Sequence, residues 1–228
     1  MKVREISCGK MHELTIALDK AGFDSELIQK IINSENNKMA ESMYVSIVEK
    51  KTEPTEKFTL FADLGIIMVP EDYVHEKQLG LFEKKNRKKF YFYNDAITDT
   101  NFSNPTRILK PGDKLWVRAF KQVISGNTTS EDRMGFLKKM NAIHTGAQGA
   151  SLVWEQKRDL LPKGYWYCSF DEKDRLWKDA DGNHRVPFVN AHSDGDFKLD
   201  LGSFENDWHG HSVILVFCNL PASEQAST

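Results

Sequence analysis

The chain has 228 residues, of which 40% are hydrophobic and 28% are charged, and its formal net charge at pH 7 is −2. These values are typical of a soluble protein with one large domain, or one domain plus a small appendage, and they argue against wholesale nucleic-acid binding. Cys8, Cys168 and Cys218 are too widely spaced for a disulfide framework or a CxxC metal site, which favours a reducing, cytoplasmic setting. The longest apolar runs are far shorter than the ~20 residues that span a bilayer, so we expect no membrane contact.

Residues 1–50 predict a small module of three amphipathic helices. Met11, Leu14 and Leu18 fall on one helical face, and Asp24 stands where a second helix would be capped. In the third helix apolar pairs recur every four residues, which gives a continuous apolar stripe. A DNA-reading helix is disfavoured because acidic side chains oppose a phosphate approach. The module is therefore predicted to dock a protein partner.

Residues 51–56 are polar and contain Pro54, so they predict a linker, and residues 57–220 predict an α+β domain. Short strands separated by tight turns outnumber helices in this region. They favour a mixed or mostly antiparallel sheet with a few packed helices. Residues 221–228 predict a flexible tail. The strands are expected at 58–61, 66–69, 90–93, 115–120, 151–155, 165–170, 186–189, 197–201 and 211–218, and the helices at 71–87 and from Thr129 to about Ile143.

A histidine and aspartate cluster near the carboxyl end is a candidate metal site. Residues two apart on a strand point the same way, so two of these imidazoles are able to face one zinc or iron ion, with a carboxylate as third ligand. The alternative is that these residues form polar hairpin turns. A divalent transition metal is predicted as a cofactor only if these residues form a metal site. If they form hairpin turns, no cofactor is predicted. The candidate ligands are His192, Asp194, His209 and His211, with Asp196 beside them.

A basic run followed by aromatic residues is a candidate nucleic-acid contact. The favoured alternative is that these cations complement a helix C-terminus and that the aromatic residues are core. Nucleic acid is therefore the less favoured partner. The residues of the run are Lys84, Lys85, Arg87, Lys88 and Lys89.

Four further patterns are interpreted as structural. The stretch 179–183 begins like a calcium loop but lacks its third acidic position and its bidentate Glu, so it predicts a turn. Gly146 to Gly149 follow a predicted helix, so they are expected to end it and not to hold phosphate. Cys168 is expected in the core. Carboxylates of the kind that a sugar hydrolase needs are Glu155, Asp171, Glu172 and Asp174, but residues 171–174 are expected to form a solvated turn.

Several segments resemble a group of uncharacterised bacterial proteins to which no activity is assigned, so the resemblance implies no function. It covers most of the chain after residue 57. The group tends to carry Asp where this chain has His in the segment 208–211, and this difference counts against the histidine metal site. The segments that resemble the group are 90–95, 97–99, 109–115, 145–151, 169–174 and 193–197.

No established catalytic pattern is present in the sequence. We therefore expect a non-catalytic binding or accessory protein, whose helical module docks a partner. A metal-dependent hydrolase or nuclease at the His/Asp cluster is the first alternative. A nucleic-acid accessory protein that uses the run 84–89 is the second.

Overall fold

A computed structural model describes residues 57–220 and, before them, only Asp24, Glu26, Gln29, Lys30 and Asn33. The chain divides into two compact units, Met1–Thr55 and Glu56–Thr228. Of the five isolated residues, Glu26, Gln29 and Lys30 are helical. Apart from these residues, the predicted three-helix module at 1–50, the linker at 51–56 and the tail at 221–228 lie outside the described residues.

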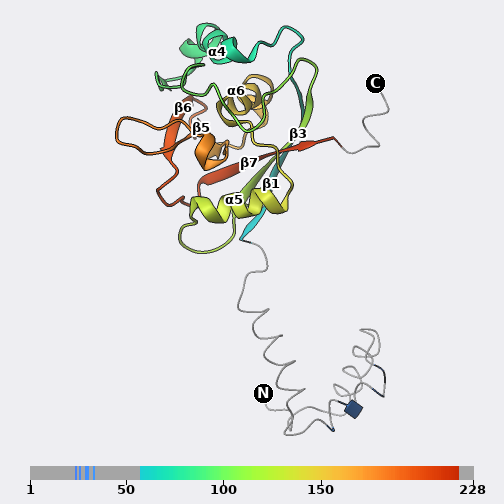
Figure 1. Ribbon diagram of the computed structural model, residues 1–228. Coiled ribbons are helices and arrows are strands. Elements are labelled where there is room, and N and C mark those ends of the chain that lie inside the picture. The colour runs from blue at the N-terminus through green and yellow to red at the C-terminus, as the bar shows by residue number, and fades with distance from the viewer. Residues whose placement is uncertain (1–23, 25, 27–28, 31–32, 34–56, 221–228) are drawn as a thin grey trace. The chain divides into compact units, whose positions relative to one another are not determined.

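Within residues 57–220 one mixed sheet has seven strands in the order β1-β3-β7-β4-β5-β6-β2 (Figure 1). The pairs β7–β4 and β6–β2 are parallel, and the other four neighbouring pairs are antiparallel. The predicted α+β class with a mixed, mostly antiparallel sheet is therefore confirmed. The strands are β1 (Phe58–Met68), β2 (Phe92–Tyr93), β3 (Lys114–Gln122), β4 (Tyr165–Cys168), β5 (Arg185–Ala191), β6 (Phe197–Ser203) and β7 (Ser212–Asn219).

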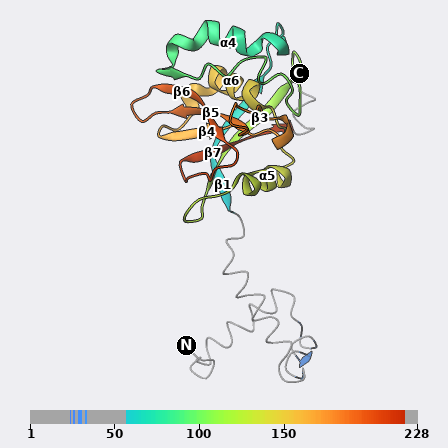
Figure 2. The ribbon, with the colours of Figure 1, turned by 60° about the vertical axis from the view of Figure 1, so that its left-hand side comes forward.

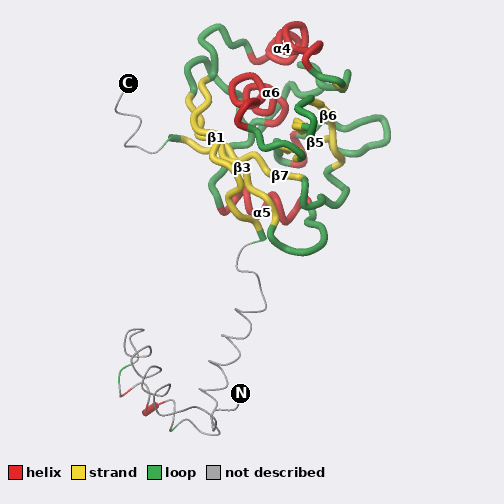
Figure 3. The backbone as a smooth tube through the Cα atoms, turned by 180° about the vertical axis from the view of Figure 1, so that it is seen from behind, coloured by secondary structure: helices red, strands yellow, loops and turns green. Residues whose placement is uncertain are grey.

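Helices cover both faces of the sheet. Helices α4 (Gln78–Asn86) and α6 (Gly146–Lys157) lie on one side, and α5 (Ser130–Lys139) lies on the other, as Figures 2 and 3 show. Short 3-10 turns at His75–Lys77, Arg87–Lys89, Arg158–Leu160 and Lys173–Arg175 join these elements. No helix in the described part of the chain has the length and apolar character to cross a membrane.

One hydrophobic core lies on each face of the sheet. Strand β7 contributes side chains to both cores because it lies near the middle of the sheet. Its residues from Ser212 to Phe217 are all buried, and successive side chains of a strand point to opposite faces. Val213, Leu215 and Phe217 pack with α6, whereas Ile214 and Val216 belong to the core beneath α5. A strand that is covered on both faces is apolar without alternation, which is the pattern of this segment.

Strand β1 corrects the prediction of two strands at 58–61 and 66–69. It is one strand of 11 residues that pairs with β3, with register shifts at Leu60/Ala62 and Asp63/Gly65. Gly65 adopts a positive φ of 71°, and its N–H donates to Asp63 Oδ1 at 2.9 Å. The Asp-Leu-Gly sequence, which resembled a turn, therefore forms a β-bulge within a continuous strand.

The predicted strand at 151–155 is wrong, because these residues lie inside α6. Nine consecutive residues of α6, from Gly146 to Trp154, are buried, so the helix has no polar face and no helical period in its sequence. Gly146 to Gly149 begin this helix and do not end the previous one. Helix α5 ends earlier, at Lys139, and Asn141 at φ 47° turns the chain before Ile143 bridges to Phe217.

The start of α5 follows its sequence signal. Thr129 caps the helix and accepts from the Asp132 N–H at 3.1 Å, and the Asp132 carboxylate accepts from the Thr129 N–H at 3.3 Å. This capping box needs only residues three apart in the chain. In contrast, the predicted helix at 71–87 is regular only from Gln78, where the Asp99 carboxylate accepts from the first-turn N–H groups of Leu79 and Gly80.

Candidate functional site

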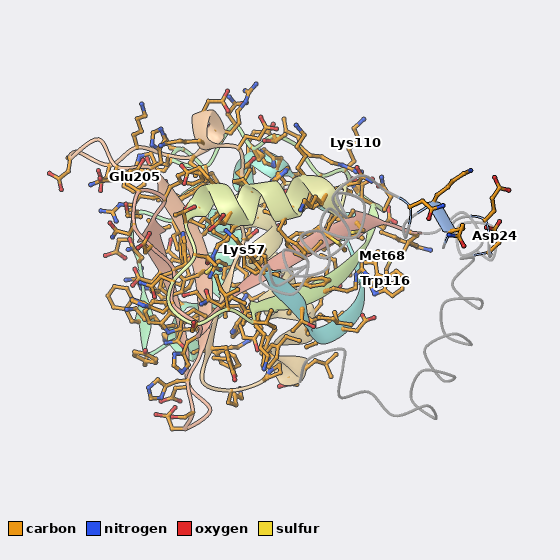
Figure 4. The ribbon with its side chains drawn as sticks, turned by 90° about the horizontal axis from the view of Figure 1, so that it is seen from below. Asp24, Lys57, Met68, Lys110, Trp116 and Glu205 are labelled. Atoms are coloured by element: carbon orange, nitrogen blue, oxygen red, sulfur yellow. The ribbon has the colours of Figure 1, made fainter. Side chains whose placement is uncertain are left out.

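A groove of about 900 Å³ lies between α5 and the loops that follow β4 and precede β7. We call it the α5 groove. In Figure 4, which looks onto the α5 side, α5 crosses in front of the strands and Glu205 lies toward one end of it. A concave site with a few convergent polar groups is the usual place for a ligand. The groove is lined by Thr106, Glu131, Met134, Gly135, Lys138, Asn141, Ala142, His144, Glu172, Lys173, Asp174 and Phe204.

Three distant segments meet at the inner wall of the α5 groove. The Arg107 N–H donates to the His144 carbonyl at 3.2 Å, which ties the loop before β3 to the α5–α6 connection. The loop after β4 joins them through Asp171, because the N–H of Thr106 donates to both of its carboxylate oxygens at 3.1 and 3.2 Å. Gly146 completes the contact, since a Cβ at that position would lie 3.2 Å from Asp171 Oδ2.

Asp171 is the buried carboxylate of this site, with 2% of its surface exposed. It also accepts from the Thr106 hydroxyl and, at 2.8 Å, from the Glu172 N–H. Burial raises the pKa of Asp171. The hydrogen bonds from Thr106 and Glu172, and the charge of the nearby His144, oppose only part of this rise. The expectation that Asp171 lies in a solvated turn is therefore wrong. Glu172 and Asp174 are exposed as expected, and Glu155 pairs with Lys85 on α4 at 2.5 Å.

His144 contributes an imidazole to the groove beside this carboxylate. Its Nδ1 is buried and has no hydrogen-bond partner within residues 57–220. Buried polar atoms are nearly always paired, so an unpaired ring nitrogen at a groove is a feature of sites that receive a ligand or proton. Three other buried oxygen atoms near the start of α6 and the end of β4 also have no partner in the described part of the chain: Thr145 Oγ1, Gln148 Oε1 and Ser169 Oγ.

A network around Glu205 holds the outer wall of the α5 groove. Its carboxylate accepts from the His184 ring at 2.7 Å and from Ser203, and it lies 3.5 Å from Lys173 Nζ. Lys173 in turn lies over the Phe204 ring, 5.0 Å from its centroid, and both residues line the groove. Desolvation alone raises the pKa of Glu205, but the hydrogen bonds, first that of His184, outweigh it and hold the pKa at about 2.

The predicted metal ligands are placed in separate pairs. His192 Nδ1 lies 2.8 Å from Asp194, at the turn between β5 and β6. His209 pairs with the Asn127 side chain at 3.0 Å, and the ring of His211 packs 6.0 Å from that of Tyr165. Among the residues that the structure describes, no group of three or more His, Cys, Asp or Glu side chains is placed to hold a metal ion. The geometry therefore adds nothing in favour of the metal-dependent alternative.

The basic run lies at the end of α4 and is partly neutralised. Lys85 pairs with Glu155, and Arg87 pairs with Glu83 at 2.5 Å and with Asp95 at 2.6 Å. Lys89 donates to Asn86 at 2.9 Å. Lys84 and Lys88 are exposed, and the structure gives them no partner among residues 57–220. Of the aromatic residues that follow, Phe90 and Tyr93 are core, as expected, whereas Tyr91 is 55% and Phe92 44% exposed.

Thr106 and His144 escaped the sequence analysis, and Asp171 entered it only as a carboxylate of an expected solvated turn, for a physical reason. Thr106 and Asp171 are 65 residues apart, and neither lies in a motif. His144 stands alone between two helices. The available signal was weak: a threonine in a polar loop and an acidic residue directly after a buried strand. Cys168, in contrast, is fully buried in the core, as predicted.

Comparison with known proteins returned no relatives: no family model, no curated protein and no solved structure matches this chain. The functional argument therefore depends on the geometry of the α5 groove and its wall.

Proposed function

We propose that the α+β unit binds a small polar ligand in the α5 groove, and that the protein serves in a binding or accessory role. The single observation that supports this proposal is a groove of about 900 Å³ lined by His144, whose buried Nδ1 has no hydrogen-bond partner among the described residues. An imidazole nitrogen without a partner is able to exchange its desolvation cost for a ligand hydrogen bond. That the helical module at 1–50 docks a protein partner stays a prediction, because nearly all of these residues lie outside the part of the chain that the structure describes.

The charges at the groove indicate which ligands fit. Glu131, Glu172 and Asp174 contribute negative charge, whereas Lys138 and Lys173 contribute positive charge, and Lys173 already faces Glu205 at 3.5 Å. Asp174 likewise lies 3.9 Å from Arg175, so with both pairs set aside a polyanion would meet the carboxylates of Glu131 and Glu172 against the single ammonium of Lys138. An uncharged or cationic polar molecule is therefore the class that this groove favours.

Nuclear magnetic resonance of the ¹⁵N-labelled full chain with a library of small polar fragments tests the proposal. We expect fragments to shift the resonances of groove residues. Gly135 lies on α5 with open space around its Cβ position, so Gly135→Leu should fill the groove and weaken binding at least ~10-fold. Lys139→Leu adds the same side chain to α5 at a position that does not line the groove, and should bind normally. Binding that survives Gly135→Leu would exclude this groove.

A second candidate function is contact with single-stranded nucleic acid at the edge formed by β2. The observation in its favour is that Tyr91 and Phe92 are exposed directly after the basic run, with Lys198 Nζ 4.8 Å from the centre of the Phe92 ring. Exposed aromatic faces stack bases, and lysines follow the phosphate backbone. Asp194 and Asp196 near the same edge oppose this function, which is why it ranks second.

Fluorescence anisotropy with a labelled single-stranded oligonucleotide tests the second function. We expect Tyr91→Ala to cost about 1–3 kcal/mol of binding and Lys84→Ala with Lys88→Ala to reduce the salt dependence. Lys110→Ala, an exposed lysine outside the run, is the control for charge. Undetectable binding at low salt, or binding that does not change with salt, would remove this candidate.

A further inference from the structure

The pair formed by Thr106 and Asp171 has the chemistry of an activated nucleophile. Thr106 lines the α5 groove and is exposed, and its hydroxyl donates a hydrogen bond to a carboxylate that is 2% exposed. A hydroxyl becomes a nucleophile when a base within hydrogen-bonding reach removes its proton, and a third group must orient that base. Here the N–H groups of Thr106 and Glu172 orient the Asp171 carboxylate.

Asp171 is suited to accept this proton. Burial raises its pKa, so its carboxylate is a stronger base than an exposed one, while the hydrogen bonds that it accepts fix its position. The groups that face it are the Thr106 hydroxyl, the N–H groups of Thr106 and Glu172, the first turn of α6 at Gly146, and His144, and Arg175 lines the same small cavity of about 10 Å³ as Asp171.

His144 is placed to serve the opposite step. It lines the same groove, its backbone is tied to the Thr106 loop through Arg107, and its Nδ1 has no partner within residues 57–220. A protonated imidazole in that position can donate to the leaving group of a substrate. Thr106 and His144 line the groove, and Asp171 contacts Thr106 without lining the groove itself, so the three side chains are able to supply nucleophile, acid and base together.

We propose that the α5 groove catalyses hydrolysis of a small uncharged ester, with Thr106 as nucleophile, Asp171 as its base and His144 as the acid for the leaving alcohol. This inference rests on the proposed ligand site and adds an activity to it. The ester class follows from the carboxylates at the groove, Glu131, Glu172 and Asp174, which disfavour phosphate esters and other polyanions.

The steps balance without any co-reactant except water. Asp171 takes the proton of Thr106, Thr106 Oγ1 bonds to the ester carbonyl carbon, the bond from that carbon to the alkoxy oxygen breaks, and His144 protonates the alcohol that leaves. Water then attacks the acyl-threonine and gives one proton to His144, and the Thr106 oxygen regains its proton from Asp171. The products are one acid and one alcohol, and all three groups return to their starting states.

The full chain with p-nitrophenyl acetate, a small uncharged activated ester, tests the proposal. We expect release of p-nitrophenol and an acetyl adduct that peptide mass spectrometry assigns to Thr106. Thr106→Val removes the hydroxyl at nearly constant shape and should abolish the adduct and lower release at least ~100-fold toward background. Thr106→Ser keeps a hydroxyl and should keep both, and the rate should rise with pH as Asp171 loses its proton.

Two comparisons separate a catalytic role from a purely structural tie between loops. Thermal unfolding of Thr106→Val reports loss of the tie, whereas adduct and release report catalysis. If Thr106→Val does not fold, the test uses the position of the acetyl adduct in the wild type and in Thr106→Ser. An adduct at residue 106 in both proteins supports the proposal. No adduct, an adduct confined to lysines or His144, or equal release by Thr106→Val would overturn the proposal. Fragment binding in the groove without acylation would leave the ligand site standing and remove only the activity.

Discussion

The two faces of the sheet are covered in different ways. On the α6 face, Trp154 contacts Phe82, Phe90 and Phe197 at ring distances of 5.6, 4.4 and 5.7 Å, and the larger of the two cores lies there. On the α5 face the core is smaller: α5 contributes the buried Leu137 and the partly buried Met134 and Phe136, and the partly buried Met140 follows directly after the helix. The α5 groove lies beside this incomplete cover.

The α5 face also buries charge. Arg133 is fully buried, and burial lowers its pKa to about 10. Its guanidinium donates to Thr128, to the Ser212 carbonyl and to Gln122, all neutral acceptors, and it lies 5.3 Å from the centre of the Trp208 ring. Aromatic rings pack on both faces, but within residues 57–220 only the α5 face also buries a guanidinium, which neutral hydrogen-bond acceptors satisfy. Buried polar groups that must be satisfied are also the groups that a site can use.

The largest effect should come from the aromatic packing of the α6 face. Trp154→Ala removes a side chain with 1% exposure, and we expect it to lower the free energy of unfolding by about 3–5 kcal/mol, through lost burial and the cavity that remains. Urea unfolding followed by circular dichroism measures the change. Leu160→Ala, at a side chain with 57% exposure, is the control and should stay within about 0.5 kcal/mol of the wild type. Similar values for both variants would contradict a packed α6 face.

Glycine-to-alanine changes in the two helices compare their packing directly. A Cβ at Gly149 in α6 would overlap Thr145 Oγ1 and lie 3.0 Å from Phe217 Cζ, so Gly149→Ala should destabilise by about 1–3 kcal/mol. A Cβ at Gly135 in α5 meets nothing within 4 Å, so Gly135→Ala should stabilise by about 0.5–1 kcal/mol through helix propensity. The two midpoints of urea unfolding should therefore move in opposite directions. A shift in the same direction would mean that the helices are packed alike.

The capping box of α5 should have a smaller effect. Thr129→Ala removes the oxygen that accepts from the Asp132 N–H, and we expect a loss of about 1 kcal/mol in thermal or urea unfolding. Thr129→Ser retains the acceptor and is the matched control. If both variants lose the same amount, the methyl group of the threonine and not its cap hydrogen bond is what stabilises α5.

The smallest effect concerns pH and the outer wall of the groove. The pKa of Glu205 is about 2 in the folded protein and ordinarily 4.5, so this carboxylate stabilises the fold above pH 4.5 and the contribution is lost as the pH falls toward 2. Asp171, with a raised pKa, contributes in the opposite sense: its share is complete below its ordinary pKa of 3.8 and is lost as the pH rises through the folded value.

Melting temperatures between about pH 2 and 7 measure this balance. In Glu205→Gln we expect the loss of stability on the acid side to become shallower, with the protein less stable than the wild type near neutral pH. Lys110→Gln alters the surface without removing a carboxyl and should reproduce the wild-type profile. An acid branch that is unchanged in Glu205→Gln would show that the network with His184 contributes no stability.

The elements that could be predicted are those whose cause is local. The capping box at Thr129 uses residues three apart, and the turn at Lys110 to Asp113 is formed as expected, with Gly112 at φ 78°. Strands β3, β5, β6 and β7 lie where alternation or apolar runs predicted them. Helix α6 could not be recognised, because burial on every side removes the polar residues that mark a helical period.

The sequence by itself therefore determined the α+β class, the mixed sheet and the burial of Cys168, since each follows from residue type and short-range spacing. Only the tertiary structure decided that Asp171 is buried against Thr106 and that His144 lies beside them at a groove. The physical reason is that desolvation and hydrogen bonding of a side chain depend on which distant segments fold onto it. Those segments are 65 residues apart for Thr106 and Asp171, and no local pattern records their meeting.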